Sequence, residues 1–157
     1  MENQLSILSE SLDKKLQVLQ EIQEYNARQE EAFKQEQADL ESFDDAMEEK
    51  ERLIEKLTQL DEGFEALFER VSAELKDHRE QYAPQIQEMQ EKVKQVLDLS
   101  VSIQAQEARN KKLVEDYFAK ARNSLKQNRQ NSKAAYDYYK NMSGSNYASS
   151  QYMDSKQ

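Results

Sequence analysis

The fold is decided by the stretch LESFDDAMEEKERLIEKLTQLDEGFEALFERVSAELKDHREQY, which spans residues 40–82. Apolar residues recur in it at alternating steps of three and four, and this spacing keeps them on one face of an α-helix. The pattern is a heptad seam and predicts a helix over residues 39–81 that packs against other helices. The seam consists of Leu40, Phe43, Met47, Ile54, Leu57, Phe64, Phe68, Val71, Leu75 and Tyr82, with Lys50, Asp61 and His78 as polar members.

Two residues within this stretch and one just before it lead to more specific predictions. The seam keeps its phase through Gly63, so we expect a helical glycine that costs roughly 1 kcal/mol relative to alanine. Asp39 directly precedes the seam and is typical of a residue that caps a helix start. His78 is the only histidine, and its seam position predicts a half-buried packing residue without a role in a site.

Helices are also predicted on both sides of the stretch. Leucines and isoleucines at the same spacing predict a first helix over residues 4–36. The only proline, Pro84, suits a first helical turn, and a third helix follows to about residue 123, with a possible extension to 140. Its seam becomes polar at Ser100, Glu107 and Asn110. Residues 1–142 are therefore predicted to form an all-α, elongated antiparallel three-helix bundle or coiled coil, and residues 143–157 a disordered, flexible tail.

The composition argues against an enzyme. The chain has no cysteine, a single histidine and no glycine-rich loop, so thiolate metal sites, hydrolase triads, histidine-based zinc motifs and phosphate cradles lack their parts. Its clustered carboxylates lie beside lysines and arginines on solvated helix faces. We therefore predict no catalytic residues, no metal and no cofactor. The N-terminus lacks the features of a signal peptide, and no apolar run reaches the roughly 20 residues that span a bilayer. These features predict a cytoplasmic protein without membrane insertion.

The net charge of −9 is unevenly distributed. Residues 1–100 hold 12 Lys+Arg against 26 Asp+Glu, whereas residues 101–157 hold 10 against 5. The basic end, with its tyrosines, could attract nucleic acid, although it contains no recognised nucleic-acid-binding motif and the rest of the chain is acidic. We regard nucleic-acid binding as the weakest of the functional hypotheses.

A second apolar stripe follows the polar part of the third helix. It comprises Leu113, Val114, Tyr117, Phe118, Ala121 and Leu125. An uncovered apolar stripe on a long helix invites an amphipathic partner helix, so we predict that these six residues bind a partner protein. The alternative is that the stripe packs on the first helix as ordinary core. Periodicity alone does not separate the two interpretations.

The order of parts resembles the FlgN family of flagellar export chaperones. The first helix ends in the polar stretch 35–40, QEQADL. The second helix carries EKERLI at 49–54, followed by Leu57 and Leu60. The third carries Ile103, Glu107, Asn110 and Leu113 and leads into a polar tail. The resemblance covers about residues 1–142, and FliT-like chaperones have a similar outline.

The resemblance implies a function as well as a fold. Chaperones of this family are small, acidic, cytosolic and helical. They bind the amphipathic C-terminal helices of hook-associated flagellar proteins, keep these subunits soluble, and deliver them to the gate of the flagellar type III export apparatus. The resemblance implies that Leu113–Leu125 takes the role of the partner-binding segment. The alternatives from the residues alone are a structural coiled-coil homo-oligomer and, less favoured, a nucleic-acid-binding protein.

Overall fold

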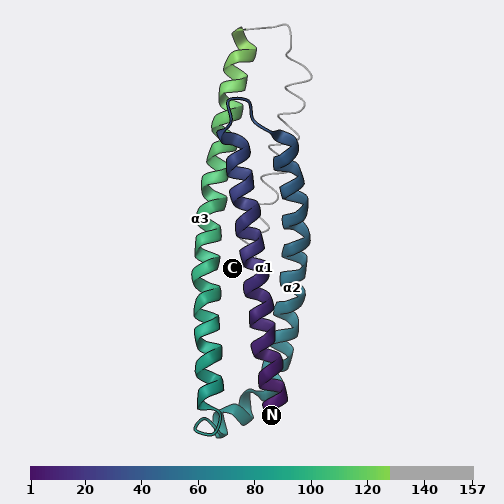
Figure 1. Cartoon of the computed structure of the whole chain (residues 1–157), viewed down its shortest axis with the longest axis vertical. Coiled ribbons are helices and arrows are strands. Elements are labelled where there is room, and N and C mark those ends of the chain that lie inside the picture. Colours follow the sequence, from purple (N-terminus) through teal and green to yellow (C-terminus); the bar gives the residue numbers. More distant parts are fainter. Residues whose placement is uncertain (128–157) are drawn as a thin grey trace. The chain divides into compact units, whose positions relative to one another are not determined.

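The computed structural model describes residues 1–127, and within them three helices contain nearly every residue. They are α1 (Glu2–Lys34), α2 (Leu40–Asp77) and α3 (Ala83–Gln127), shown in Figure 1. No strand occurs in this part of the chain. The fold is all-α, as the sequence predicts. The expected helical extension to residue 140 and the expected tail over 143–157 lie outside the described residues.

The chain forms two compact units, and each takes segments from all three helices. Within the described residues, the first unit consists of Met1–Gln23 and Arg52–Ile103, and the second of Glu24–Glu51 and residues 104–127. In each unit the α2 segment runs antiparallel to the α1 and α3 segments (Figure 1). The predicted antiparallel three-helix bundle is confirmed at this level, with a separate apolar cluster in each unit.

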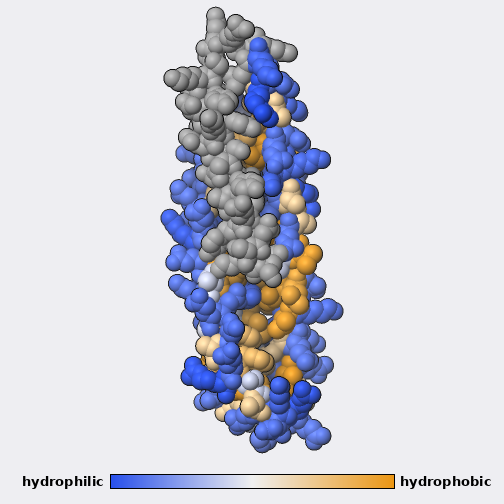
Figure 2. All heavy atoms as spheres, turned by 180° about the vertical axis from the view of Figure 1, so that it is seen from behind, coloured by the Kyte–Doolittle hydropathy of each residue, from blue (hydrophilic) through white to orange (hydrophobic). Residues whose placement is uncertain are grey.

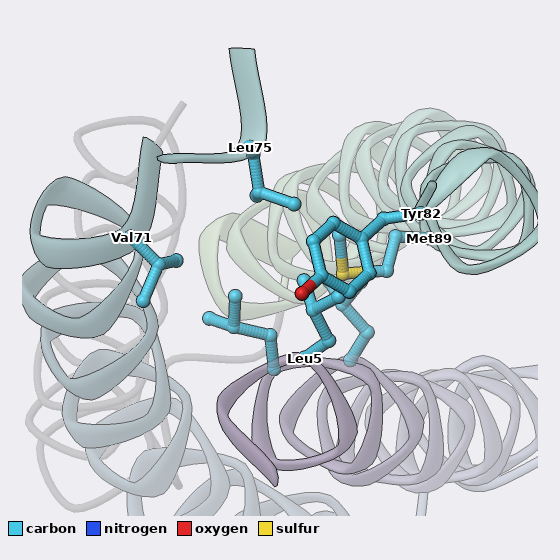
Figure 3. Packing of buried hydrophobic residues seen from close by; sticks show 7 residues of the cluster. Leu5, Val71, Leu75, Tyr82 and Met89 are labelled. Atoms are coloured by element: carbon cyan, nitrogen blue, oxygen red, sulfur yellow. The ribbon is translucent and has the colours of Figure 1, made fainter. Parts of the chain in front are cut away.

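The first unit is held together by an apolar cluster in which all three helices take part. Leucines of α1 contact Val71 and Leu75 of α2 (Figure 3). Tyr82, from the turn before α3, and Met89, from the first turns of α3, complete the cluster. The cluster comprises Leu5, Leu8, Leu12, Val71, Leu75, Tyr82 and Met89. Ile54, Leu57, Val71 and Leu75 of the α2 seam are therefore core, as their spacing predicts. Phe68, another seam member, is 42% exposed, so the prediction of core is wrong at this position.

Polar contacts at the border of the first unit tie α1 to its neighbours. Nζ of Lys15 lies 2.6 Å from Oδ1 of Asp61. Nζ of Lys92 donates to Oγ of Ser9 at 2.6 Å and lies 3.0 Å from Oδ1 of Asp13. Because these ion pairs are partly exposed, water screens them, and each contributes little to the free energy of unfolding. Their main effect is to align the helices.

The helix starts follow local sequence signals. Asp39 caps α2, because its Oδ1 accepts a hydrogen bond from the backbone N–H of Ser42 at 3.1 Å. The backbone N–H of Asp39 in turn donates to the carbonyl of Ala32 at 2.9 Å, which closes the turn after α1. Pro84 occupies the first turn of α3, where its missing N–H leaves no hydrogen bond unmade.

One sequence expectation at the second connection is wrong. His78 is exposed, whereas its seam position predicted a half-buried residue. The reason is that α2 ends at Asp77, so the chain leaves the helical path before position 78 can face the core. Nδ1 of His78 lies 3.0 Å from the carbonyl oxygen of Glu74 and forms a local hydrogen bond.

Candidate functional site

The stripe predicted to bind a partner lies in the second unit, and two of its members are core residues. Val114 is 2% exposed and Phe118 is 4% exposed. Both belong to an apolar cluster with Ala32 of α1 and with Phe43 and Met47 of α2. For these two side chains the structure shows packing against the other helices, which is the alternative that the sequence left open.

The border of this cluster is aromatic. The ring of Phe33 packs edge-to-face on Phe43 and on Tyr117, with centroid distances of 5.0 and 5.3 Å. Tyr117 in turn packs edge-to-face on Phe118 at 5.3 Å. Such pairs hold rings in defined orientations. Tyr117 is only half-buried, so its ring is held in place by the core while one side stays accessible.

The remaining members of the stripe lie nearer the surface. Leu113 and Ala121 are half-buried on α3. The side chain of Leu125 lies outside what the structure describes. The structure thus brings Val114, Tyr117 and Phe118 together in one cluster and leaves Leu113, Tyr117 and Ala121 as the partly accessible members.

A buried polar layer lies beside the aromatic cluster in the second unit. Lys50 of α2 has no exposed surface, yet it carries an ammonium group. Its Nζ donates to Oε1 of Gln29 at 2.9 Å and forms an ion pair with Glu107 of α3. Gln29 also donates through Nε2 to the carbonyl of Phe43 at 3.3 Å. Hydrogen bonds and an ion pair of this layer therefore link all three helices.

Burial lowers the pKa of Lys50, while the charge and the hydrogen bond of Glu107 act in the opposite direction. One turn of α3 further on, Nδ2 of Asn110 donates to the backbone carbonyl of Asn26 at 2.9 Å. Polar contacts of this kind fix the register of packed helices because any slip leaves buried groups unpaired. We interpret the layer as structural.

In residues 1–127 no group of three or more His, Cys, Asp or Glu side chains is arranged to hold a metal ion. The pKa of the Asp44 carboxyl is raised by partial burial and by the nearby Asp45 and Glu48. No histidine lies within this acidic group, since His78 is the only one in the chain and forms its hydrogen bond with Glu74.

The sequence reasoning missed an apolar groove in the first unit. It has a volume of about 540 Å³ and lies between α2 and α3, with Phe68 on one wall and Val93 on the other. Figure 2 shows apolar surface exposed on this part of the molecule. The missed signal is the series Val93, Leu97 and Val101 on α3, because apolar residues at this spacing are equally typical of a helix face that packs in a core.

These features define a class of protein: a small all-α binding protein with apolar surface on its helices. A family model described as FlgN protein matches residues 1–144, and the chain belongs to the FlgN family. This is a chaperone family, so the general role of the chain is that of a flagellar export chaperone. Neither a curated protein nor a solved structure matches the chain. None of the helices in the described part is long and apolar enough to cross a membrane.

Proposed function

We propose that this protein is a cytosolic chaperone for hook-associated flagellar subunits. It binds their amphipathic C-terminal helices, keeps the subunits soluble before assembly, and delivers them to the gate of the type III export apparatus. The observation that carries the proposal is the match of the FlgN family model over residues 1–144, which covers the whole described part of the chain. The apolar surface on α3 supports it, because an amphipathic helix needs such a surface to cover its own apolar face.

We propose the segment Leu113–Leu125 as one contact region for the partner. Leu113, Tyr117 and Ala121 are partly accessible and stand on one side of α3. Val114 and Phe118 lie beneath them in the core and hold this part of α3 against α1 and α2. In this arrangement the buried pair supports the binding surface, and the half-buried ring of Tyr117 makes the main apolar contact.

The test is co-purification of the full chain with a full-length hook-associated subunit from the same flagellated host. We expect the wild-type chain to retain the subunit and to keep it in the soluble fraction. Tyr117→Asp should lower retention about tenfold, since it places a charge at a desolvated contact. The matched control is Ile7→Asp, which changes an apolar side chain that is 55% exposed on α1 in the first unit.

A comparison of Phe118→Asp with Tyr117→Asp distinguishes a loss of binding from a loss of folding. Because Phe118 is buried, a carboxylate there should unfold the second unit, with a loss of helical signal in circular dichroism. Tyr117→Asp should keep the wild-type helical signal. Failure of the wild-type chain to bind any hook-associated subunit would overturn the proposed function.

A further inference from the structure

The apolar groove of the first unit has the form of a helix-binding site. Its α2 wall carries the stacked rings of Phe64 and Phe68, whose centroids lie 6.0 Å apart. Its α3 wall carries Ile86 and Val93, and Met89 and Leu75 form its floor from the buried cluster. Phe68 is 42% exposed, which is unusual for so large an apolar ring and places it at the rim.

The groove continues into an exposed apolar stripe on α3. Leu97 is 61% exposed and Val101 is 64% exposed, one and two turns beyond Val93. The series Ile86, Gln90, Val93, Leu97 and Val101 contains no charge, although about a third of the chain is charged. At 1.5 Å per residue, the 15 steps from Ile86 to Val101 span roughly 22 Å, enough for about four turns of a docked helix.

The charges around the groove select among possible occupants. Two of the lining residues are cationic, Lys76 and Arg79, and none is acidic. Neither of these two side chains forms a hydrogen bond or ion pair with another residue of the part described. Both lie at the end of the groove next to the connection from α2 to α3. The site thus presents an apolar floor and, at one end, two cations that have no ion-pair partner among the described residues.

We propose that this groove and the stripe beside it bind an amphipathic helix of the exported subunit, with the carboxyl end of that helix against Lys76 and Arg79. The proposal rests on the proposed function. The carboxyl end of a helix carries partial negative charge, and side-chain or terminal carboxylates there add to it. The opposite orientation would place the positive amino end against two cations.

The same charges disfavour the C-terminal residues of this chain as the occupant. Residues 128–157 hold four basic and two acidic side chains, a net positive charge that matches the sign of Lys76 and Arg79. A second copy of the chain remains a distinct outcome, which the mass of the protein in solution identifies. The docked helix of a subunit is the occupant that satisfies both the apolar surface and the charge.

The experiment measures binding of a fluorescently labelled synthetic peptide by anisotropy, using the full chain. The peptide carries the C-terminal helical region of a hook-associated subunit from the same host. Leu97→Asp/Val101→Asp should raise Kd at least about tenfold, as should Lys76→Glu/Arg79→Glu. The controls are Ile7→Asp, a single apolar-to-acidic change, and Lys56→Glu/Arg70→Glu, which repeats the double charge reversal. All three positions are exposed in the first unit and do not line the groove.

The orientation has its own readout. The peptide with a free C-terminal carboxylate should bind the wild-type chain several-fold more tightly than its C-terminal amide. Lys76→Glu/Arg79→Glu should remove this difference, whereas the Lys56/Arg70 control should preserve it. A difference that persists in the Lys76/Arg79 variant would overturn the proposed orientation. All the substituted side chains are exposed, so circular dichroism should give the wild-type helical signal for each variant.

The remaining outcomes distinguish failure of the groove as a docking site from failure of the proposed chaperone function. Wild-type binding that is unchanged in the groove variants would overturn the groove as a docking site and leave the chaperone role intact. Absence of binding by the wild-type chain to both peptide and full-length subunit would overturn both proposals. A wild-type dimer in light scattering that the Leu97/Val101 variant converts to a monomer, with peptide affinity unchanged, would assign the groove to a second copy.

Discussion

Lys50 is a fully buried charged residue in the second unit. A buried ammonium group is costly unless it is paired, and this one has both an ion-pair partner in Glu107 and an acceptor in Gln29. The pair does not imply high stability, because desolvation offsets much of the attraction. We expect its clearer effect to be on specificity, since a slip of α2 along α3 would separate the two buried charges.

We expect Lys50→Met to lower the free energy of unfolding by about 3–5 kcal/mol, because the largely buried Glu107 loses its cation. Lys50→Met/Glu107→Met should cost less than the single change, since no unpaired charge remains. Denaturant unfolding measures both. The control Lys56→Met, at an exposed position of the same helix, should change stability by less than about 0.5 kcal/mol. A double variant less stable than Lys50→Met would contradict this account.

The same residue gives a pH dependence with a definite sign. Burial lowers the pKa of Lys50 below its ordinary value of 10.5, so the unfolded chain binds the proton more tightly than the folded chain. Between the folded pKa and 10.5, stability therefore rises with pH. Unfolding measured at several pH values should show the wild type gaining stability relative to Lys50→Met as this range is crossed. A relative loss would mean that Glu107 outweighs desolvation and raises the pKa.

At the scale of the elements, the regular parts of the fold are readable from the sequence. The seam of α2 follows from side-chain spacing, and Asp39 follows from its chemistry as a cap, because both are local properties. The end of α2 was placed four residues too late, since the spacing continues past Asp77 while the backbone turns. Tyr82, in the turn before α3, packs in the buried cluster of the first unit, and spacing along one segment contains no information about such tertiary contacts.

The cap of α2 should make a measurable contribution to stability. Asp39→Ala removes the acceptor for the Ser42 N–H and should lower the free energy of unfolding by about 1 kcal/mol. Asp39→Asn keeps an acceptor oxygen and should cost much less. Thermal and denaturant unfolding of the two variants provide the measurement. Equal losses in the two variants would show that the charge of Asp39, and not its cap, is the stabilising feature.

At the scale of the whole molecule, pairings between distant residues limit what the sequence predicts. Glu107 and Asn110 were predicted to lie at core positions, and both are largely buried. That Glu107 meets Lys50, 57 positions earlier, depends on how the helices align, which no local pattern encodes. The partner-binding stripe shows the same limit, because Val114 and Leu113 are neighbours in sequence but differ in burial. The groove was missed because the exposure of Phe68 and Val93, which line it, is a property of the assembled helices.

The division into two units leads to a final prediction about local stability. Each unit has its own apolar cluster, with Leu75 in the first and Met47 in the second. Both side chains are almost fully buried, so truncation to alanine should cost roughly 2–5 kcal/mol in either place. If the units open separately, the loss should be felt mainly in the unit that contains the substitution.

Hydrogen exchange followed by mass spectrometry measures this directly. Met47→Ala should accelerate exchange in residues 24–51 and 104–127, while Leu75→Ala should accelerate it in residues 1–23 and 52–103. The two variants control each other, because each helix contributes segments to both units. Equal acceleration throughout residues 1–127 in either variant would show one cooperative unit instead. Separate opening would allow one unit to lose its structure while the other stays folded.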